Sequence, residues 1–274
     1  MMNPIDTLFQ RLRAANRKAF IPFLPAGDPD MALTRDAIVA VAGAGASLIE
    51  VGFPFSDPIA DGPVIQESYT RALSKNLKLA DIFSTLKTIT TTPGWQTPLV
   101  AMSSYSIIWK KGPEQFIADA QAAGLSGAVV PDLPVEEAEE LAKRCRDHGF
   151  ALILLVTPTT SPERAAKIVA ACSGFVYVVS IVGITGDKSG VPGQIQEMMT
   201  RLRTMTDKPL CVGFGVNRPE QVRELRDIAD GVIVGTALVR KLCGANTLEG
   251  RVQAVSEIRG LVFDLSMALN DGLS

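Results

Sequence analysis

Residues 47–63 read SLIEVGFPFSDPIADGP, and this stretch decides how the chain is expected to fold. Its first part, 47–51, is a short apolar run that carries one carboxylate, Glu50. Side chains alternate between the two faces of a strand, so Leu48 shares a face with Glu50 while Ile49 shares the other with Val51. The stretch therefore predicts a strand that ends in a long loop.

Similar apolar runs recur along the chain and give eight candidate strands: 19–24, 47–51, 98–103, 127–131, 151–156, 175–179, 209–213 and 231–234. Stretches with helical signals lie between them. Eight strand–helix units in 274 residues predict a single (β/α)₈-barrel domain, a TIM barrel, over residues 1–274. A doubly wound open sheet is the alternative, and it is disfavoured because no GxGxxG motif follows the first strand.

Capping signals predict where several helices begin. Asn3 precedes a proline and starts an additional N-terminal helix that could plug the barrel floor. Residues 134–148 carry acidic side chains early and basic ones late, as the helix dipole favours. Ser161 starts another helix, and Asn217 with Glu220 three residues later resembles a capping box.

Composition narrows the class of protein. An apolar fraction of 47% suits a compact α/β protein rather than a disordered one. A net charge of −2 gives no reason to expect a nucleic-acid or acidic-membrane partner. The four cysteines form no CxxC motif, and neither a signal peptide nor a membrane-length apolar run is visible. We expect a reduced, cytoplasmic protein.

The chain has one histidine, His148, near the end of the predicted helix 134–148. Cationic groups are favoured at helix C-termini, so a structural role explains it. A catalytic histidine stays open, but no metal site with several histidines can form. That disfavours metal-dependent barrel enzymes such as pentose-phosphate epimerases, and we expect no metal.

Barrel active sites lie where the strands end. Glu50 is expected to point into the barrel mouth among apolar neighbours, where desolvation would raise its pKa and suit it to acid–base chemistry. A structural salt bridge fits the sequence equally well. The loop 52–63 is long and therefore a candidate for function; its Asp57 and Asp61 could reach over the strand ends or merely cap turns.

Two glycine-rich turns, 213–217 (GFGVN) and 235–238 (GTAL), follow the last two predicted strands. Glycines there let backbone N–H groups approach a phosphate, although tight turns also use glycine. The glycine-rich loop 180–190 is a candidate lid. No lysine lies in a predicted strand and Lys188 lies in that loop, so a Schiff-base mechanism has no obvious nucleophile.

The segments 47–52 (SLIEVG) and 54–63 (PFSDPIADGP) resemble the signature of tryptophan synthase α subunits. Supporting matches are 20–28 (FIPFLPAGD), 131–137 (PDLPVEE), 183–186 (GITG) and 213–215 (GFG), so the resemblance covers nearly the whole chain. It implies a lyase of tryptophan biosynthesis that splits indole-3-glycerol phosphate into indole and glyceraldehyde 3-phosphate. It also implies an α₂β₂ heterotetramer in which the β subunit carries pyridoxal phosphate (PLP) and this chain carries no cofactor.

The resemblance also implies roles for individual residues. Asp61 would hold the indole N–H and stabilise the charge that develops there. Glu50 would supply the proton to indole C3 and take the proton from the side-chain hydroxyl. Asp57 belongs to the loop that communicates with the β subunit. The residues implied to bind substrate are Phe23, Tyr177, Thr185, Gly186, Phe214, Gly215, Gly235 and Thr236.

Four positions depart from the family pattern. Ser104 and Ser106 stand where relatives commonly have tyrosine and asparagine, and Tyr105 between them would face the other way if the strand continued. Ile181 replaces a frequent arginine, and Thr236 replaces a frequent serine but keeps the hydroxyl. These changes concern the indole pocket and the coupling between subunits.

Three other functions fit parts of the sequence. A stand-alone indole-releasing lyase would share the site. A catalytically silent barrel that activates a β subunit is disfavoured because both carboxylates are retained. Another sugar-phosphate enzyme, such as an isomerase, would need a lysine or histidine at a strand end, and the sequence offers neither.

Overall fold

The structure is a computed structural model that describes residues 2–58, 61–180, 193–213 and 215–273. Its strands form one parallel sheet in the order β5-β4-β3-β2-β1-β9-β8-β7-β6. The strands are β1 (Ala19–Pro25), β2 (Ile49–Gly52), β3 (Leu99–Met102), β4 (Leu125–Val129), β5 (Ala151–Ile153), β6 (Leu155–Val156), β7 (Val176–Val179), β8 (Leu210–Gly213) and β9 (Gly231–Val234).

The sheet closes on itself through a single interrupted strand. β5 and β6 stand at the two ends of the strand order, yet only Leu154 separates them in the sequence. Together they occupy the predicted strand 151–156, so the barrel has eight strand positions. The prediction of a (β/α)₈ barrel is confirmed, with its fifth strand broken at one residue.

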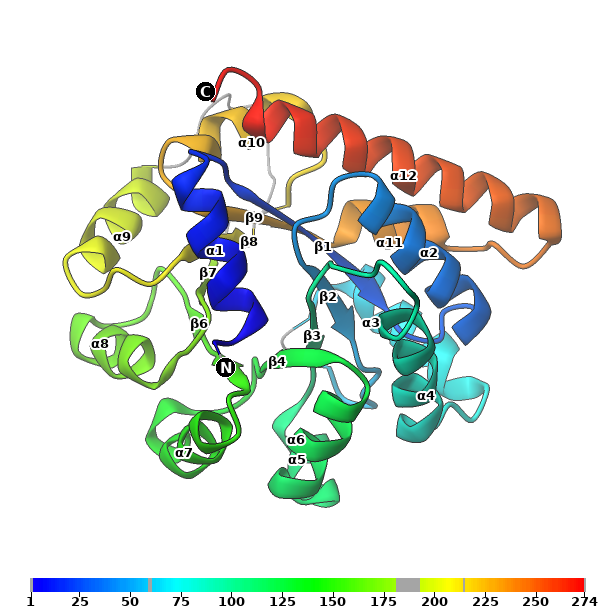
Figure 1. Ribbon diagram of the computed structural model, residues 1–274, viewed down its shortest axis with the longest axis horizontal. Coiled ribbons are helices and arrows are strands. Elements are labelled where there is room, and N and C mark those ends of the chain that lie inside the picture. The colour runs from blue at the N-terminus through cyan, green and yellow to red at the C-terminus, as the bar shows by residue number, and fades with distance from the viewer. Residues whose placement is uncertain (1, 59–60, 181–192, 214, 274) are drawn as a thin grey trace.

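Helices surround the strands, as Figure 1 shows. They are α1 (Pro4–Ala14), α2 (Met31–Gly43), α3 (Pro63–Ser74), α4 (Leu79–Thr90), α5 (Tyr105–Lys111), α6 (Pro113–Ala122), the 3₁₀ turn η1 (Val135–Glu137), α7 (Glu139–Asp147), α8 (Pro162–Ala171), α9 (Gly193–Arg203), α10 (Pro219–Arg226), α11 (Thr236–Leu242) and α12 (Leu248–Asn270). The long helix α12 packs against α2 and α10 along the outside of the barrel.

Alternation along each strand builds two separate apolar layers. Leu48 and Val100 point inward and pack with the other residues that fill the barrel. Ile49 and Val51 point outward into the larger layer between the strands and the helices. Glu50 lies on the inward face with Leu48, as the sequence predicts, because the side chains of a strand repeat every two residues.

Helix α1 plugs the barrel floor. Asn3 caps the helix by accepting the backbone N–H of Ile5 at 2.8 Å. Its side-chain amide also donates to the carbonyls of Ser126 at 2.8 Å and Gly149 at 2.9 Å, which ties the helix to two distant segments. In Figure 1 the dark blue helix lies across the strands. Its buried apolar residues, Ile5, Leu8, Phe9 and Leu12, join the core inside the barrel.

Two helix starts differ from the sequence prediction. The stretch 134–148 begins as η1 and becomes regular only in α7; short 3₁₀ segments are common at helix N-termini. The capping box predicted at Asn217 and Glu220 is wrong. Arg218 is the N-cap of α10, and the side chain of Gln221 accepts its N–H at 3.1 Å. Proline is favoured at the first helical position, and Pro219 places the start there.

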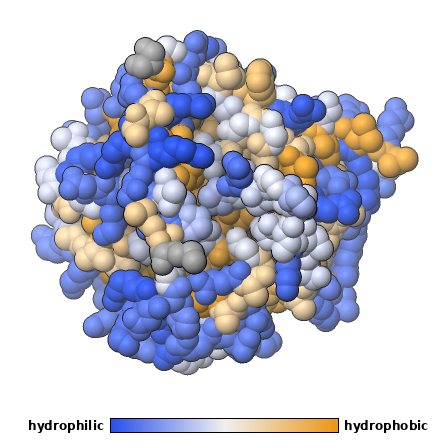
Figure 2. Space-filling model, viewed as in Figure 1, coloured by the Kyte–Doolittle hydropathy of each residue, from blue (hydrophilic) through white to orange (hydrophobic). Residues whose placement is uncertain are grey.

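The surface in Figure 2 is mostly hydrophilic, with hydrophobic atoms gathered at the right, where α12 begins. Leu248 and Val252 of that helix are 80% and 66% exposed. Among the described residues, no helix combines the length and the apolar character that a membrane crossing needs.

Candidate active site

Glu50 is sealed inside the barrel mouth. Its side chain is 1% exposed, and its Oε1 has no hydrogen-bond partner among the described residues. Burial raises the pKa of Glu50 to about 8, and the nearby Asp61 carboxylate adds to the rise. The described residues provide no salt bridge for Glu50, so the structural alternative is not supported. A buried, unpaired carboxyl group costs stability and therefore points to function.

Asp61 lies near Glu50, at the end of the loop that follows β2. Its backbone N–H donates to the carbonyl of Pro58 at 3.0 Å, and Gln66 of α3 donates to its carbonyl at 2.7 Å. These contacts hold the loop onto the first turns of α3. Burial, followed by the charge of Asp132, raises the pKa of Asp61 to about 6. Because the pKa of Asp61 lies below that of Glu50, Asp61 loses its proton first as the pH rises.

Two cavities meet at Asp61 and Met102, which line both of them. The larger has a volume of about 680 Å³. Its walls include Phe23, Tyr177, Gly215, Gly235 and Thr236, so the structure brings together the predicted ring-binding and phosphate-binding residues. The smaller has a volume of about 220 Å³ and opens toward the loop that carries Asp57.

Aromatic side chains form the walls around Glu50, and two glycines make room for them. A Cβ on Gly52 would lie 2.5 Å from both the Phe23 ring and the Tyr69 hydroxyl, and a Cβ on Gly213 would lie 2.6 Å from the Tyr177 ring. Burial raises the pKa of Tyr69 and of Tyr177, and the charges of Glu50 and Asp61 add to both shifts. Both phenols are therefore close to the carboxyl pair and stay protonated.

The helix α3 is anchored from outside the site. Arg71 donates to both carboxylate oxygens of Asp28, at 3.0 Å and 2.7 Å, and Asp28 is 2% exposed. Bidentate pairs of this kind fix orientation as well as distance. The pair holds the loop after β1 against the helix that carries Tyr69 and follows Asp61.

Ser104 does not continue the strand. β3 ends at Met102, and Ser104 is the N-cap of α5, accepting the N–H of Ser106 at 3.2 Å. Its hydroxyl donates to Oδ2 of Asp132 at 2.6 Å, while Oδ1 of Asp132 accepts the N–H of Tyr105 at 2.8 Å. Tyr105 is expected to face opposite to Ser104 and Ser106 only if the strand continues through them. The strand does not continue, because Tyr105 is the first residue of α5.

The far end of the larger cavity carries positive charge. Arg240 and Lys241 of α11 line it beside Gly235 and Thr236. Lys241 pairs with Glu257 at 3.0 Å. Arg240 is exposed, and the described side chains provide no carboxylate partner for it.

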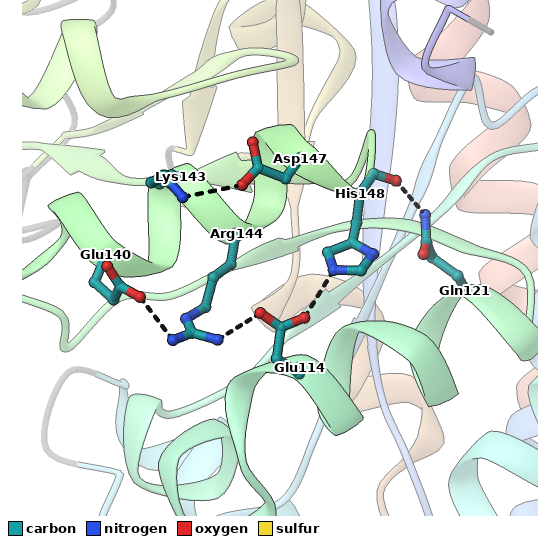
Figure 3. Close-up of polar contacts among 7 residues, drawn as sticks. All are labelled: Glu114, Gln121, Glu140, Lys143, Arg144, Asp147 and His148. Carbon is teal, nitrogen blue, oxygen red and sulfur yellow. Dashed lines mark hydrogen bonds and ion pairs between the residues drawn. The ribbon is translucent and has the colours of Figure 1, made fainter.

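His148 lies outside this site, on the surface between α6 and α7 (Figure 3). It is the C-cap of α7, and its Nε2 lies 2.7 Å from Oε2 of Glu114. Glu114 also pairs with Arg144, which in turn pairs with Glu140. The structural role predicted for the histidine is confirmed. Within the described ranges, no group of three or more acidic, cysteine or histidine side chains could hold a metal.

Several predicted residues lie outside the described residues: Ile181, Thr185, Gly186, Lys188 and Phe214. The predicted lid 180–190 falls almost entirely there. Asp57 is exposed and lines the smaller cavity.

Sequence reasoning missed Asp132, Tyr69 and Arg240. Asp132 follows the end of β4 by three residues, so the rule that located Glu50 could have found it. The other two lie inside helices, where the sequence gives no sign of which face meets the site.

Comparison with known proteins identifies the family. A family model described as "Tryptophan synthase alpha chain" matches residues 9–266. The chain belongs to the tryptophan synthase alpha chain family. Its resemblance to that family, inferred from the motifs, is thus confirmed, and the chain is a lyase of tryptophan biosynthesis that cleaves indole-3-glycerol phosphate.

Relatives match over nearly their whole length. The tryptophan synthase alpha chain of Rhodopirellula baltica is 48% identical, covering 89% of this chain and 88% of the relative. That of Rippkaea orientalis is 42% identical, covering 98% and 99%. The crystal structure of tryptophan synthase subunit alpha from Legionella pneumophila superposes with a TM-score of 0.89 at 32% identity, covering 99% of this chain and 100% of that one.

Proposed function

We propose that Glu50 and Asp61 divide the proton handling of indole-3-glycerol phosphate cleavage. The observation that carries this assignment is that Glu50 is buried with its Oε1 unpartnered among the described residues, close to the Asp61 carboxylate. Burial raises the pKa of both groups but to different levels, about 8 for Glu50 and about 6 for Asp61. Neighbouring acids whose environments separate their pKa values can act as acid and as charge stabiliser at one pH. Protonated Glu50 is the acid, and ionised Asp61 accepts the indole N–H.

The cavity suggests how the substrate lies. The phosphate binds at the backbone of Gly215, Gly235 and Thr236, and the indole ring lies between Phe23 and Tyr177. This pose spans the larger cavity from its glycine-lined end to Asp61. We place C3 of the ring toward Glu50, which is the neighbour of Phe23 in the register of β1 and β2.

The reaction then needs no group beyond the chain and the substrate. Glu50 protonates C3, and the ring nitrogen takes up positive charge that the Asp61 carboxylate stabilises. The glycerol hydroxyl next to the ring then gives its proton to Glu50 as the bond from C3 to the glycerol carbon breaks. That bond pair returns to the ring, indole and glyceraldehyde 3-phosphate leave, and Glu50 is again protonated.

We further propose that the chain works with a PLP-carrying β subunit in an α₂β₂ assembly, holds no cofactor of its own and acts in the cytoplasm as one domain. Family membership supports this, and similar solved structures include tryptophan synthase from Mycobacterium tuberculosis, which matches with a TM-score of 0.88 at 33% identity. Asp57, at the exposed rim of the smaller cavity, is the proposed contact for communication between subunits.

Release of indole from indole-3-glycerol phosphate by the purified chain, alone and with a tryptophan synthase β subunit, tests both proposals. Slow release alone and strong stimulation by the β subunit support the complex. Fast release alone supports a stand-alone lyase. If the wild-type chain forms indole and the Glu50→Gln variant does not, the assignment of Glu50 as the acid is supported. An active Glu50→Gln variant refutes that assignment.

A further inference from the structure

The smaller cavity is separate from the space that the proposed pose of indole-3-glycerol phosphate fills. It shares only Asp61 and Met102 with the larger cavity, and its own volume is about 220 Å³. A water molecule takes up about 30 Å³ in the liquid, so the smaller cavity has room for several additional heavy atoms. It is therefore large enough to receive a substituent that projects past Asp61.

The lining of this cavity combines two kinds of side chain. Phe53, Phe55, Pro58 and Pro131 are apolar, and Tyr69 adds a ring with one hydroxyl. Ser103, Ser104, Ser106, Asp57 and Asp132 contribute hydroxyl and carboxylate groups. The cavity can therefore take an aromatic edge that carries a polar group.

Asp132 is placed to accept hydrogen bonds in this cavity. Asp132 is held by the Ser104 hydroxyl at 2.6 Å and by the N–H of Tyr105 at 2.8 Å. Each carboxylate oxygen has about two acceptor sites, so one on each remains after these bonds. The Ser104 hydroxyl has its proton committed to Asp132, and its oxygen already accepts the N–H of Ser106 at 3.2 Å. A donor arriving in the cavity thus meets a fixed acceptor.

The proposed pose of the ring shows which of its positions face this acceptor. With N1–H against Asp61, the carbons of the six-membered ring nearest to N1 are C7 and then C6. Because Asp61 stands at the junction of the cavities, substituents on these two carbons point toward the smaller one.

We propose that the smaller cavity is a specificity site that accepts a hydroxyl or amino group at C6 or C7 of the indole ring, with Asp132 as the acceptor. The inference rests on the proposed pose of the substrate. It names a substrate class, ring-hydroxylated or ring-aminated indoles and their glycerol phosphates, for which Ser104 leaves space and Asp132 provides recognition.

The reverse condensation of indoles with glyceraldehyde 3-phosphate tests the proposal. The probes are indole, its 6- and 7-hydroxy derivatives and the 6- and 7-methyl derivatives, which have nearly the same size. A site built to hydrogen-bond a hydroxyl discriminates strongly against an analogue that leaves its polar group unpaired. We expect kcat/KM for the better hydroxyindole to exceed that of its methyl counterpart by about 10-fold or more.

Two variants and a control locate the effect. Asp132→Asn keeps the shape but removes the charge, and it should lower the hydroxyl-to-methyl ratio several-fold. Ser104→Tyr fills the cavity and should lower kcat/KM for both derivatives relative to indole. Ser84→Tyr, the same change on the exposed face of α4, is the matched control and should leave the ratios unchanged.

The outcomes separate the inference from the function on which it rests. If indole itself is not condensed, the proposed function fails. If indole is condensed but hydroxyl and methyl derivatives react alike, or if Asp132→Asn leaves their ratio unchanged, the specificity site is refuted.

Discussion

Replacing Glu50 with glutamine should remove catalysis. It should also increase the stability of the variant relative to the wild type as the pH rises. In the folded chain the pKa of Glu50 is about 8, compared with 4.5 for an exposed glutamate. Between these values the folded state keeps a proton that the unfolded state has released. Stability from this carboxyl group is therefore fully present below pH 4.5 and is lost progressively until pH 8.

The size of the effect follows from the two pKa values. Each unit of pH costs about 1.4 kcal/mol within the window, so the penalty in the wild type is about 3 kcal/mol at pH 7. Glutamine does not titrate, and any cost of burying its amide is the same at every pH. The stability of the variant relative to the wild type should therefore rise by about 3 to 4 kcal/mol between pH 5 and pH 8.

Urea unfolding of both proteins across this range measures the difference directly. The same substitution at Glu67, exposed on α3, is the matched control for removing one carboxylate. A difference between Glu50→Gln and the wild type that does not change with pH would show that Glu50 ionises as freely in the folded chain as in the unfolded one. It could not then be the acid that is protonated at neutral pH.

Three other perturbations test the site and its surroundings. Asp61→Asn should lower kcat/KM on the order of 10²-fold. In the wild type, kcat/KM should fall as the pH drops through about 6, where Asp61 takes up a proton, and the variant should lose this part of the fall. A fall near pH 6 that remains in the variant belongs to the substrate phosphate, whose second pKa is also about 6. Arg240→Gln should raise KM several-fold at low salt with little change in kcat, because the charge of Arg240 attracts the substrate phosphate. Arg259→Gln, which removes an exposed arginine of α12 that does not line the cavity, is the control and should leave KM unchanged. Equal KM values in both variants would exclude attraction by Arg240. Glu114→Gln should lower Tm at neutral pH. The hydrogen bond with His148, more than any other contact, lowers the pKa of Glu114. The difference in Tm between variant and wild type should therefore disappear as the solution is acidified and Glu114 takes up a proton. A difference in Tm that persists in acid would mean that the charge of Glu114 contributes nothing to stability.

Much of the fold could be predicted because it follows from local periodicity. The alternation of Leu48, Ile49 and Glu50 already placed the carboxylate on the inner face, and the cap formed by Asn3 located the first helix. The break at Leu154 could not be predicted, since the apolar run 151–156 continues through it. The exact start of α10 depended on whether Asn217 or Arg218 would cap it, and their spacing from later side chains fits either choice.

The candidate site divides in the same way. Residues at strand ends, such as Glu50 and Gly235, could be predicted from the rule that barrel strands end at the active site. Tyr69 reaches the site from a helix, and only the packing of that helix turns it inward. The bond between Ser104 and Asp132 joins segments 28 residues apart, and neither segment alone indicates that the other lies beside it.

The plug at the barrel floor bears on the order in which the molecule can assemble. Helix α1 precedes every strand of the barrel in the sequence, yet the apolar surface that receives it is assembled from residues reaching from Ala19 to Ile233. Asn3 likewise waits for carbonyl groups 123 and 146 positions further on. Contacts this distant in sequence form slowly, because a long loop must close before they contribute. Helix α1 thus docks late, and until it does the barrel stays open at its base.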